Sequence, residues 1–164
     1  MVVQHPHPLA HRARRAGFTL IETMVVLALL AILASLAGPA MSRFVAGQRV
    51  KSSASSLHLA LVKARSEAIK RNATVSVQPI TGTNWNSGWN VVSGTTVLDV
   101  SPANARVEVT TTPSGTGLVS FRADGRTSTG AIEFDLKSPL ASSFRRVCID
   151  AAGRPYVKEG STCS

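Results

Sequence analysis

The sequence predicts an α+β fold in which one long N-terminal helix is followed by a domain of short strands. Residues 18–41 are mostly apolar, and residues 42–72 carry apolar side chains at helical spacing. After Asn72 the apolar positions recur at every second residue instead. Because the helical signals come first and the strand signals follow, the two kinds of element are expected to segregate.

The apolar run is the first element. Arg12, Arg14 and Arg15 precede it, and Glu22 is the only charged residue between them and Arg43. About twenty apolar residues are enough to cross a bilayer as a helix, and the arginines favour a cytoplasmic location for its N-terminal side. The residues after the run are therefore expected outside the cytoplasm.

Glu22 is unusual inside such a segment. A carboxylate within a bilayer costs roughly 2.5–3.5 kcal/mol on insertion scales, so Glu22 needs a cation. Cleavage between Gly17 and Phe18 would create an α-amine four residues before it, and the helix N-terminus adds partial positive charge. Two other interpretations stay open: a secretory signal peptide cut after Ser35-Leu36-Ala37, or a single-pass anchor whose glutamate reaches the interface.

Residues 42–72 are expected to continue as an amphipathic helix. A proline inside a helix removes a hydrogen bond, so a kink is expected just before Pro39. Steps of four and three place six apolar residues on one face: Val50, Ala54, Leu57, Leu61, Ala64 and Ala68. The other side, interpreted as a solvated face, carries Arg49, Lys51, Lys63, Arg65, Lys70 and Arg71. The narrow, alanine-rich apolar face favours close packing on a sheet.

The rest of the chain contains short runs typical of strands. Seven of them are expected at residues 74–77, 89–92, 96–100, 107–111, 118–122, 132–136 and 146–149. Asp124-Gly125 favours a tight turn between the fifth and the sixth run. Gly153 indicates a last hairpin between Ile149 and Tyr156.

Composition limits the chain to one modest domain behind the N-terminal segment. The 164 residues carry a net charge of +9, and removal of residues 1–17 with their three arginines leaves +6. Such a basic balance attracts nucleic acid, anionic lipid or acidic proteins without specifying which.

Cys148 and Cys163 are the only cysteines, and they lie in a segment expected outside the cytoplasm. A disulfide is therefore predicted between them, and closing such a loop contributes about 3 kcal/mol. Too few other ligands lie nearby for a zinc site, so no metal or cofactor is expected.

Residues for catalysis are scarce. His5, His7 and His11 would leave with residues 1–17, so only His58 would remain. Sequence motifs of nucleophilic serine, phosphate-binding and zinc-protease sites are absent. An enzyme is therefore not expected.

The N-terminal residues resemble the type IV pilin signature: a basic leader that ends in Gly17, then Phe18, then Glu22 as the fifth mature residue before a long apolar helix. The resemblance implies that a prepilin peptidase cuts after Gly17 and methylates the amine of Phe18. It also implies that Glu22 pairs with the N-terminus of a neighbouring subunit during assembly. The implied segments are the leader 1–17, the transmembrane and filament-core helix 18–41, the amphipathic helix 42–72 and a β-rich region 73–164 with a C-terminal disulfide loop, in a pilin-like fold with an antiparallel sheet.

Later motifs are similar to those of the GspH/FimT branch of pseudopilins and minor pilins. These are Ser66–Asn72 at the helix end, Gly88-Trp89, Phe121–Arg126, and Gly153-Arg154 before a cysteine. The resemblance implies a non-enzymatic subunit of a type IV pilus or a type II secretion pseudopilus, at the tip or in the initiation complex. It would be a single-pass protein of the bacterial inner membrane with its C-terminal domain in the periplasm. Its partners would be other pilins or pseudopilins, the prepilin peptidase and the membrane.

A cluster of cations near the C-terminus supports an alternative function, DNA binding for uptake in natural transformation. Arg145, Arg146, Arg154 and Lys158 could contact phosphates. Some FimT-type minor pilins bind DNA through a C-terminal G-R-x-R motif, whereas this chain has Gly153-Arg154-Pro155-Tyr156 and lacks the second arginine. A basic strand rim that makes subunit contacts is the preferred interpretation.

Overall fold

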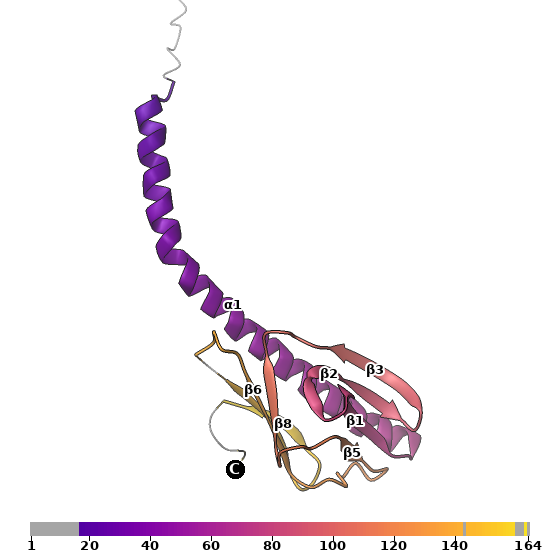
Figure 1. The fold of residues 1–164 in the computed structure, drawn as a ribbon. Helices are drawn as coiled ribbons and strands as arrows, with labels where there is room; N and C mark the ends of the chain where they lie inside the picture. Colours follow the sequence, from indigo (N-terminus) through magenta and orange to yellow (C-terminus); the bar gives the residue numbers. More distant parts are fainter. Residues whose placement is uncertain (1–16, 143, 160–162, 164) are drawn as a thin grey trace, which may run out of the picture. The chain divides into compact units, whose positions relative to one another are not determined.

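The computed structural model describes residues 17–142, 144–159 and 163, and it leaves the side chains of residues 36, 37 and 39 undescribed. The predicted leader lies outside the described residues, apart from Gly17. The chain divides into two compact units, Met1–Gly38 and Pro39–Ser164. Figure 1 shows that the first described element is a long helix and that strands follow it.

Helix α1 spans Leu20–Arg71 and begins with a capping residue. The Thr19 hydroxyl accepts a hydrogen bond from the Glu22 amide at 3.3 Å, which satisfies a donor that the first turn leaves unpaired. Glu22 lies in the first turn and Lys70 and Arg71 in the last. Both ends therefore carry the charge that the helix dipole favours.

The end of α1 is fixed by Asn72, which adopts a left-handed conformation with φ of 48°. The amide of Ala73 then donates to the carbonyl of Ala68 at 3.2 Å. This pattern is a Schellman-type ending, in which the left-handed residue turns the chain out of the helix. The helix end expected near Arg71-Asn72 is thus found there.

The hydropathy of α1 indicates a candidate membrane span only for two segments taken together. Within the described residues, no single helix is long and apolar enough to cross a membrane. Two segments separated by a short break, Leu20–Ser35 and Ala40–Arg71, are together long and apolar enough, judged by length and composition alone. The kink at Pro39 stays a prediction.

Within the described residues, eight strands form two four-stranded antiparallel sheets. The first has the order β3-β2-β1-β5 and the second β4-β6-β7-β8. Their bounds are β1 Val75–Thr81, β2 Asn84–Ser93, β3 Thr96–Pro102, β4 Glu108–Thr112, β5 Val119–Phe121, β6 Ile132–Lys137, β7 Arg145–Ile149 and β8 Pro155–Lys158. The α+β prediction is confirmed, with two sheets in the domain.

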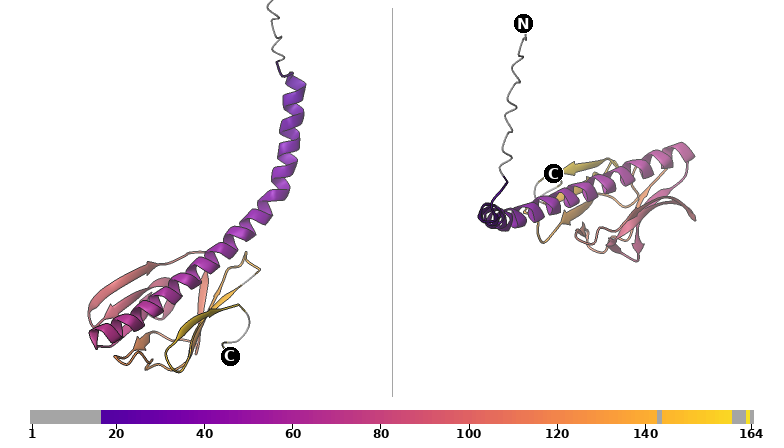
Figure 2. Two further views of the ribbon diagram at one scale, coloured as in Figure 1. Left: turned by 180° about the vertical axis from the view of Figure 1, so that it is seen from behind. Right: turned by 90° about the horizontal axis from the view of Figure 1, so that it is seen from above.

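The second half of α1 lies along the strands, as both views of Figure 2 show. Its six predicted apolar positions, Val50, Ala54, Leu57, Leu61, Ala64 and Ala68, are each at most 1% exposed. Lys63 pairs with Asp99 of the edge strand β3 at 2.8 Å. His58 Nε2 lies 3.3 Å from the carbonyl oxygen of Pro155 in the opposite edge strand, β8. The helix therefore contacts an edge strand of each sheet.

One continuous core joins the helix to both sheets. Trp85 of β2 meets Phe134 of β6 edge to face, with ring centroids 4.7 Å apart. The indole N–H of Trp85 donates to the carbonyl of Thr116 at 2.6 Å, so this buried polar group is satisfied. Asn86 links the sheets again, because its side-chain oxygen accepts a hydrogen bond from the amide of Val109 at 2.6 Å.

Candidate assembly site and C-terminal basic region

The N-terminal half of α1 presents apolar side chains on all sides. Every described residue from Gly17 to Ser35 is exposed, and Phe18 is 81% exposed. The large apolar side chains among them are Phe18, Leu20, Ile21, Met24, Val25, Val26, Leu27, Leu29, Leu30, Ile32 and Leu33. A helix that is apolar all round is stable only when a bilayer or other protein surrounds it. This segment therefore requires an environment that the chain alone does not provide.

Glu22 lies at the beginning of this apolar segment. Its amide is bound by the Thr19 cap, but among the described residues no hydrogen bond or ion pair involves its carboxylate. Gly17 and Phe18 precede α1, which begins at Leu20, and Phe18 is four residues before Glu22. The three residues predicted for processing and assembly therefore lie close together in sequence at the start of α1.

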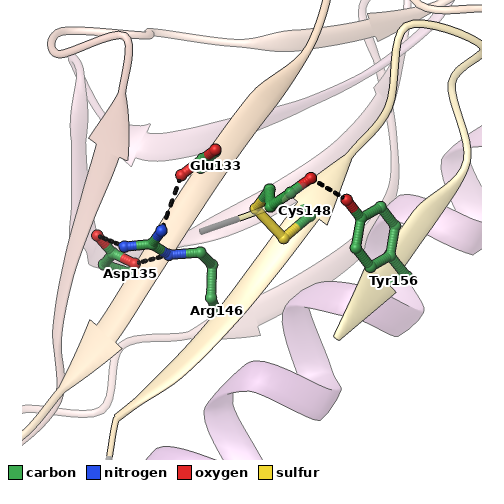
Figure 3. The surroundings of a disulfide bond; sticks show 6 residues. Glu133, Asp135, Arg146, Cys148 and Tyr156 are labelled. Carbon is green, nitrogen blue, oxygen red and sulfur yellow. Dashed lines mark hydrogen bonds and ion pairs between the residues drawn. A yellow bond between two sulfur atoms is a disulfide. The ribbon is translucent and has the colours of Figure 1, made fainter. Parts of the chain in front are cut away.

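Arg146 on β7 is held by two carboxylates of the adjacent strand β6 (Figure 3). Its guanidinium lies 2.5 and 2.9 Å from the two oxygens of Asp135 and 3.0 Å from Glu133. Arg146 and Asp135 are direct partners in the β6–β7 register, which places both side chains on the same face. The hydrogen bonds that the guanidinium donates to Asp135 hold the pKa of Arg146 above its usual value.

The other C-terminal arginines are paired as well. The Arg154 guanidinium lies 2.7 Å from Asp150, and Arg145 pairs with Glu159. The amide of Arg154 also donates to Asp150, and this hydrogen bond is the main reason that the pKa of that carboxyl is lowered.

The structure brings only some of the four side chains that were predicted to contact phosphate close to one another. Lys158 on β8 is the register partner of Arg146, whereas Arg154 lies in the turn before β8. A phosphate at the three arginines would have to displace carboxylates that already neutralise them. Their geometry is therefore that of an ion-paired sheet surface.

The predicted disulfide is present. Cys148, which is fully buried on β7, is bonded to Cys163, with Cα atoms 5.8 Å apart. Tyr156 is the register partner of Cys148 and donates its hydroxyl to the carbonyl of Cys163 at 2.6 Å. The disulfide and this hydrogen bond attach the tail to the β7–β8 hairpin (Figure 3).

Comparison with known proteins identifies the family. The family model described as type II transport protein GspH matches residues 53–153, more than half of the chain. The chain belongs to the GspH family. A second model, the prokaryotic N-terminal methylation motif, matches residues 12–38 of this GspH-family chain. The match covers Gly17, Phe18 and Glu22.

Two crystal structures of the type IV minor pilin FimU from Pseudomonas aeruginosa strain PAO1 share the fold. They are 20% identical to this chain, with TM-scores of 0.61 and 0.60, and cover 74% and 70% of it and 99% of their own length. No curated protein matches at a significant level. The family model assigns the chain to the GspH type II transport proteins, and the likeness to FimU shows that it has the fold of that minor pilin. They give no support to the DNA-binding alternative.

The structure of this GspH-family chain shows why its scattered motifs belong together. A Cβ atom built on Gly125 would lie 2.8 Å from Cδ1 of Ile69, at the end of α1. A Cβ atom on Gly153 would lie 2.8 Å from the carbonyl oxygen of Gly125. The helix end, the 121–126 turn and Gly153 therefore stack in contact. Sequence reasoning assigned each glycine to a turn but missed this contact, for which the only signal was a glycine in each motif.

The described part of the chain offers no arrangement for metal chemistry. No group of three or more histidine, cysteine, aspartate or glutamate side chains is placed there to hold a metal ion. The described residues form a packed β-rich domain and a helical segment with exposed apolar side chains.

Proposed function

We propose that this chain is a non-enzymatic subunit of a type IV pilus or a type II secretion pseudopilus, located at the filament tip or in the initiation complex. One observation carries the proposal: residues 18–35 are exposed and mostly apolar, and their single carboxylate has no partner among the described residues. The N-terminal methylation motif matches this same segment. Burial of such a surface in a filament core would supply what the isolated chain lacks.

In the proposed sequence of events, the chain first enters the inner membrane through residues 18–41. A prepilin peptidase then cuts between Gly17 and Phe18 and methylates the new amine. The arginines before the apolar run favour retention of the N-terminal side in the cytoplasm, which places the β-rich domain in the periplasm. This orientation would allow Cys148 and Cys163 to oxidise.

Assembly would exchange lipid contacts for contacts with other subunits. Glu22 would accept the N-terminal amine of a neighbour, so that two buried charges neutralise each other instead of remaining unpaired. The contact is heterologous, because Glu22 of one subunit meets the amine of the next, and such contacts repeat along a helical filament. The β-rich domains would then cover the outside.

Intact-mass measurement of the protein purified from its host tests the processing step. The expected mass is that of a chain that starts at Phe18 and carries one added methyl group. A chain that starts at Gly38 would establish an ordinary signal peptide, because cleavage would then follow Ser35-Leu36-Ala37. An uncut chain would establish a plain membrane anchor, and either result would contradict the proposed function.

A further inference from the structure

A basic hollow lies where α1 enters the β-rich domain. It has a volume of about 340 Å³, and its lining includes Arg43, Phe44, Lys51, Ser142 and Arg145. None of the described residues that line it is acidic. Lys51 and Arg145 also line an adjoining hollow of about 270 Å³, which Lys158 and Glu159 complete. Cations therefore exceed carboxylates across both hollows.

Two of the lining cations are unpaired within the described part of the chain. Arg145 pairs with Glu159, but no ion pair there involves Arg43 or Lys51. Both lie on α1, eight residues apart, and steps of four place them on one side of the helix. Their charge is available to an anion from outside the chain.

Exposed apolar side chains surround these cations. Met41 and Phe44 on α1 are each 62% exposed. Leu140 is 51% and Phe144 40% exposed, in the loop between β6 and β7 that also contributes Ser142 to the hollow. This loop lies beside α1, because residues of both line the same hollow (Figure 1). Aromatic and cationic side chains together are typical of a surface that contacts the membrane–water interface.

The position along the chain identifies the membrane as the partner. Arg43 follows Met41, the last residue of the apolar run, by two positions. Lys51 is eight residues further on, which is roughly 12 Å along a helix. When the apolar run is in a bilayer, both cations are therefore within reach of the headgroups.

We propose that this headgroup surface, formed by Arg43, Phe44 and Lys51 of α1, docks on anionic phospholipids of the leaflet next to the domain. Phosphates of the lipids would occupy the basic hollow, and Phe44 would enter the interface between them. The inference rests on the proposed membrane insertion and adds a second contact to it. Docking holds the domain against the membrane before assembly, and this contact breaks when the subunit enters a filament.

A fluorescence quenching experiment tests the docking. The full chain with Leu140→Cys, its disulfide oxidised, is labelled with a fluorophore and reconstituted in nanodiscs that contain a headgroup spin-labelled lipid. One set contains only phosphatidylcholine besides this lipid, and the other also contains phosphatidylglycerol. Quenching is expected to be stronger in the anionic nanodiscs and to weaken at about 1 M salt, where the screening length is about 3 Å.

Matched variants identify the cations. Arg43→Gln together with Lys51→Gln should reduce quenching in anionic nanodiscs to the neutral level, because the ratio of docked to free domain falls roughly fivefold for each cation removed. Lys70→Gln together with Arg71→Gln removes the same charge from the far end of α1 and should leave quenching unchanged.

The outcomes separate this inference from the proposed function. Equal quenching in neutral and anionic nanodiscs, or equal loss in both double variants, would overturn the headgroup contact alone. Failure of the chain to remain with nanodiscs during gel filtration would overturn the membrane insertion and this inference with it. Binding of duplex DNA that Arg43→Gln and Lys51→Gln abolish, without lipid-dependent quenching, would reassign the surface to nucleic acid.

Discussion

In the proposed function, Glu22 couples membrane insertion to assembly. In a bilayer its charge costs roughly 2.5–3.5 kcal/mol when it has no partner. In the structure its amide is capped by Thr19, while no described residue pairs with its carboxylate. In the proposed function, Glu22 would therefore destabilise a membrane-inserted monomer, and a contact that supplies a cation would remove this cost.

The substitution Glu22→Ala is expected to separate these two effects. Insertion and processing should persist, because removal of the charge eases insertion, while recovery in sheared filaments should fall at least tenfold. The measurement is immunoblotting of membranes and of sheared pili or pseudopili. Glu22→Gln keeps the size of the side chain and should fail in the same way.

Glu67→Gln serves as the control for this prediction. Glu67 pairs with Lys70 and Arg71 at the surface of the domain, so its loss should leave filament recovery normal. Normal recovery of Glu22→Ala would show that the carboxylate has no role in assembly.

At the scale of elements, the turn at Gly125 lies against the end of α1, and the turn at Gly153 lies against the turn at Gly125. Gly153 has φ of 79°, and a side chain there would meet backbone atoms on the 121–126 turn and just after it. Gly130 has the same φ of 79°, but a Cβ on it would meet nothing within 4 Å. A side chain at either glycine would therefore carry the same conformational penalty. Only a side chain at Gly153 would also clash with neighbouring atoms.

Gly153→Ala is accordingly expected to lower the free energy of unfolding more than Gly130→Ala. The left-handed conformation costs roughly 1–2 kcal/mol for either alanine, and overpacking adds about 1–3 kcal/mol at Gly153 alone. Urea titration of the full chain in detergent measures both variants. Equal losses would show that the contact between the turns contributes nothing to stability.

The elements that the sequence predicts well are those with local signals. The buried face of α1 follows from its spacing, and each predicted strand overlaps an observed one. The errors have physical reasons. Strand β1 continues past Pro79 to Thr81, and β2 begins at Asn84, five positions earlier than expected, because hairpin pairing extends strands through residues without apolar alternation.

Pairing between distant strands could not be predicted in this way. β4 pairs with β6 rather than with its neighbour β5, so the domain has two sheets. Periodicity alone does not specify which strands pair.

The same limit applies to the candidate site. Gly17, Phe18 and Glu22 form a local pattern that is readable in sequence. The ion pairs of Arg146 depend on the β6–β7 register. The sequence therefore shows that Arg146 is a cation but not which carboxylates pair with it.

At the scale of the whole molecule, a few carboxylates that interact with cations or backbone amides contribute to the stability of this basic chain. After removal of residues 1–17 the net charge is +6. Among the described residues, four carboxyl groups have lowered pKa values: Glu67 through its hydrogen bond with Arg71, Asp99 through Lys63, and Asp124 and Asp150 through the amides of Arg126 and Arg154. They lie at the end of α1, on the edge strand β3 and in the turns at Gly125 and Gly153.

The free energy of unfolding is therefore expected to fall in acid. A carboxyl whose pKa is lowered by folding stabilises the native state above its unfolded value of about 4, and this contribution is lost as pH falls through the folded value. Protonation also raises the net positive charge, so repulsion adds to the loss. Urea titrations of the full chain in detergent between about pH 7 and 3 should show a decline in the free energy of unfolding that begins near pH 5.

The variant Asp99→Asn removes one of the four groups. It should therefore be less stable than wild type at pH 7 and lose less stability on acidification. A wild-type stability that is unchanged or higher at pH 3 would mean that these carboxylates do not fasten the domain.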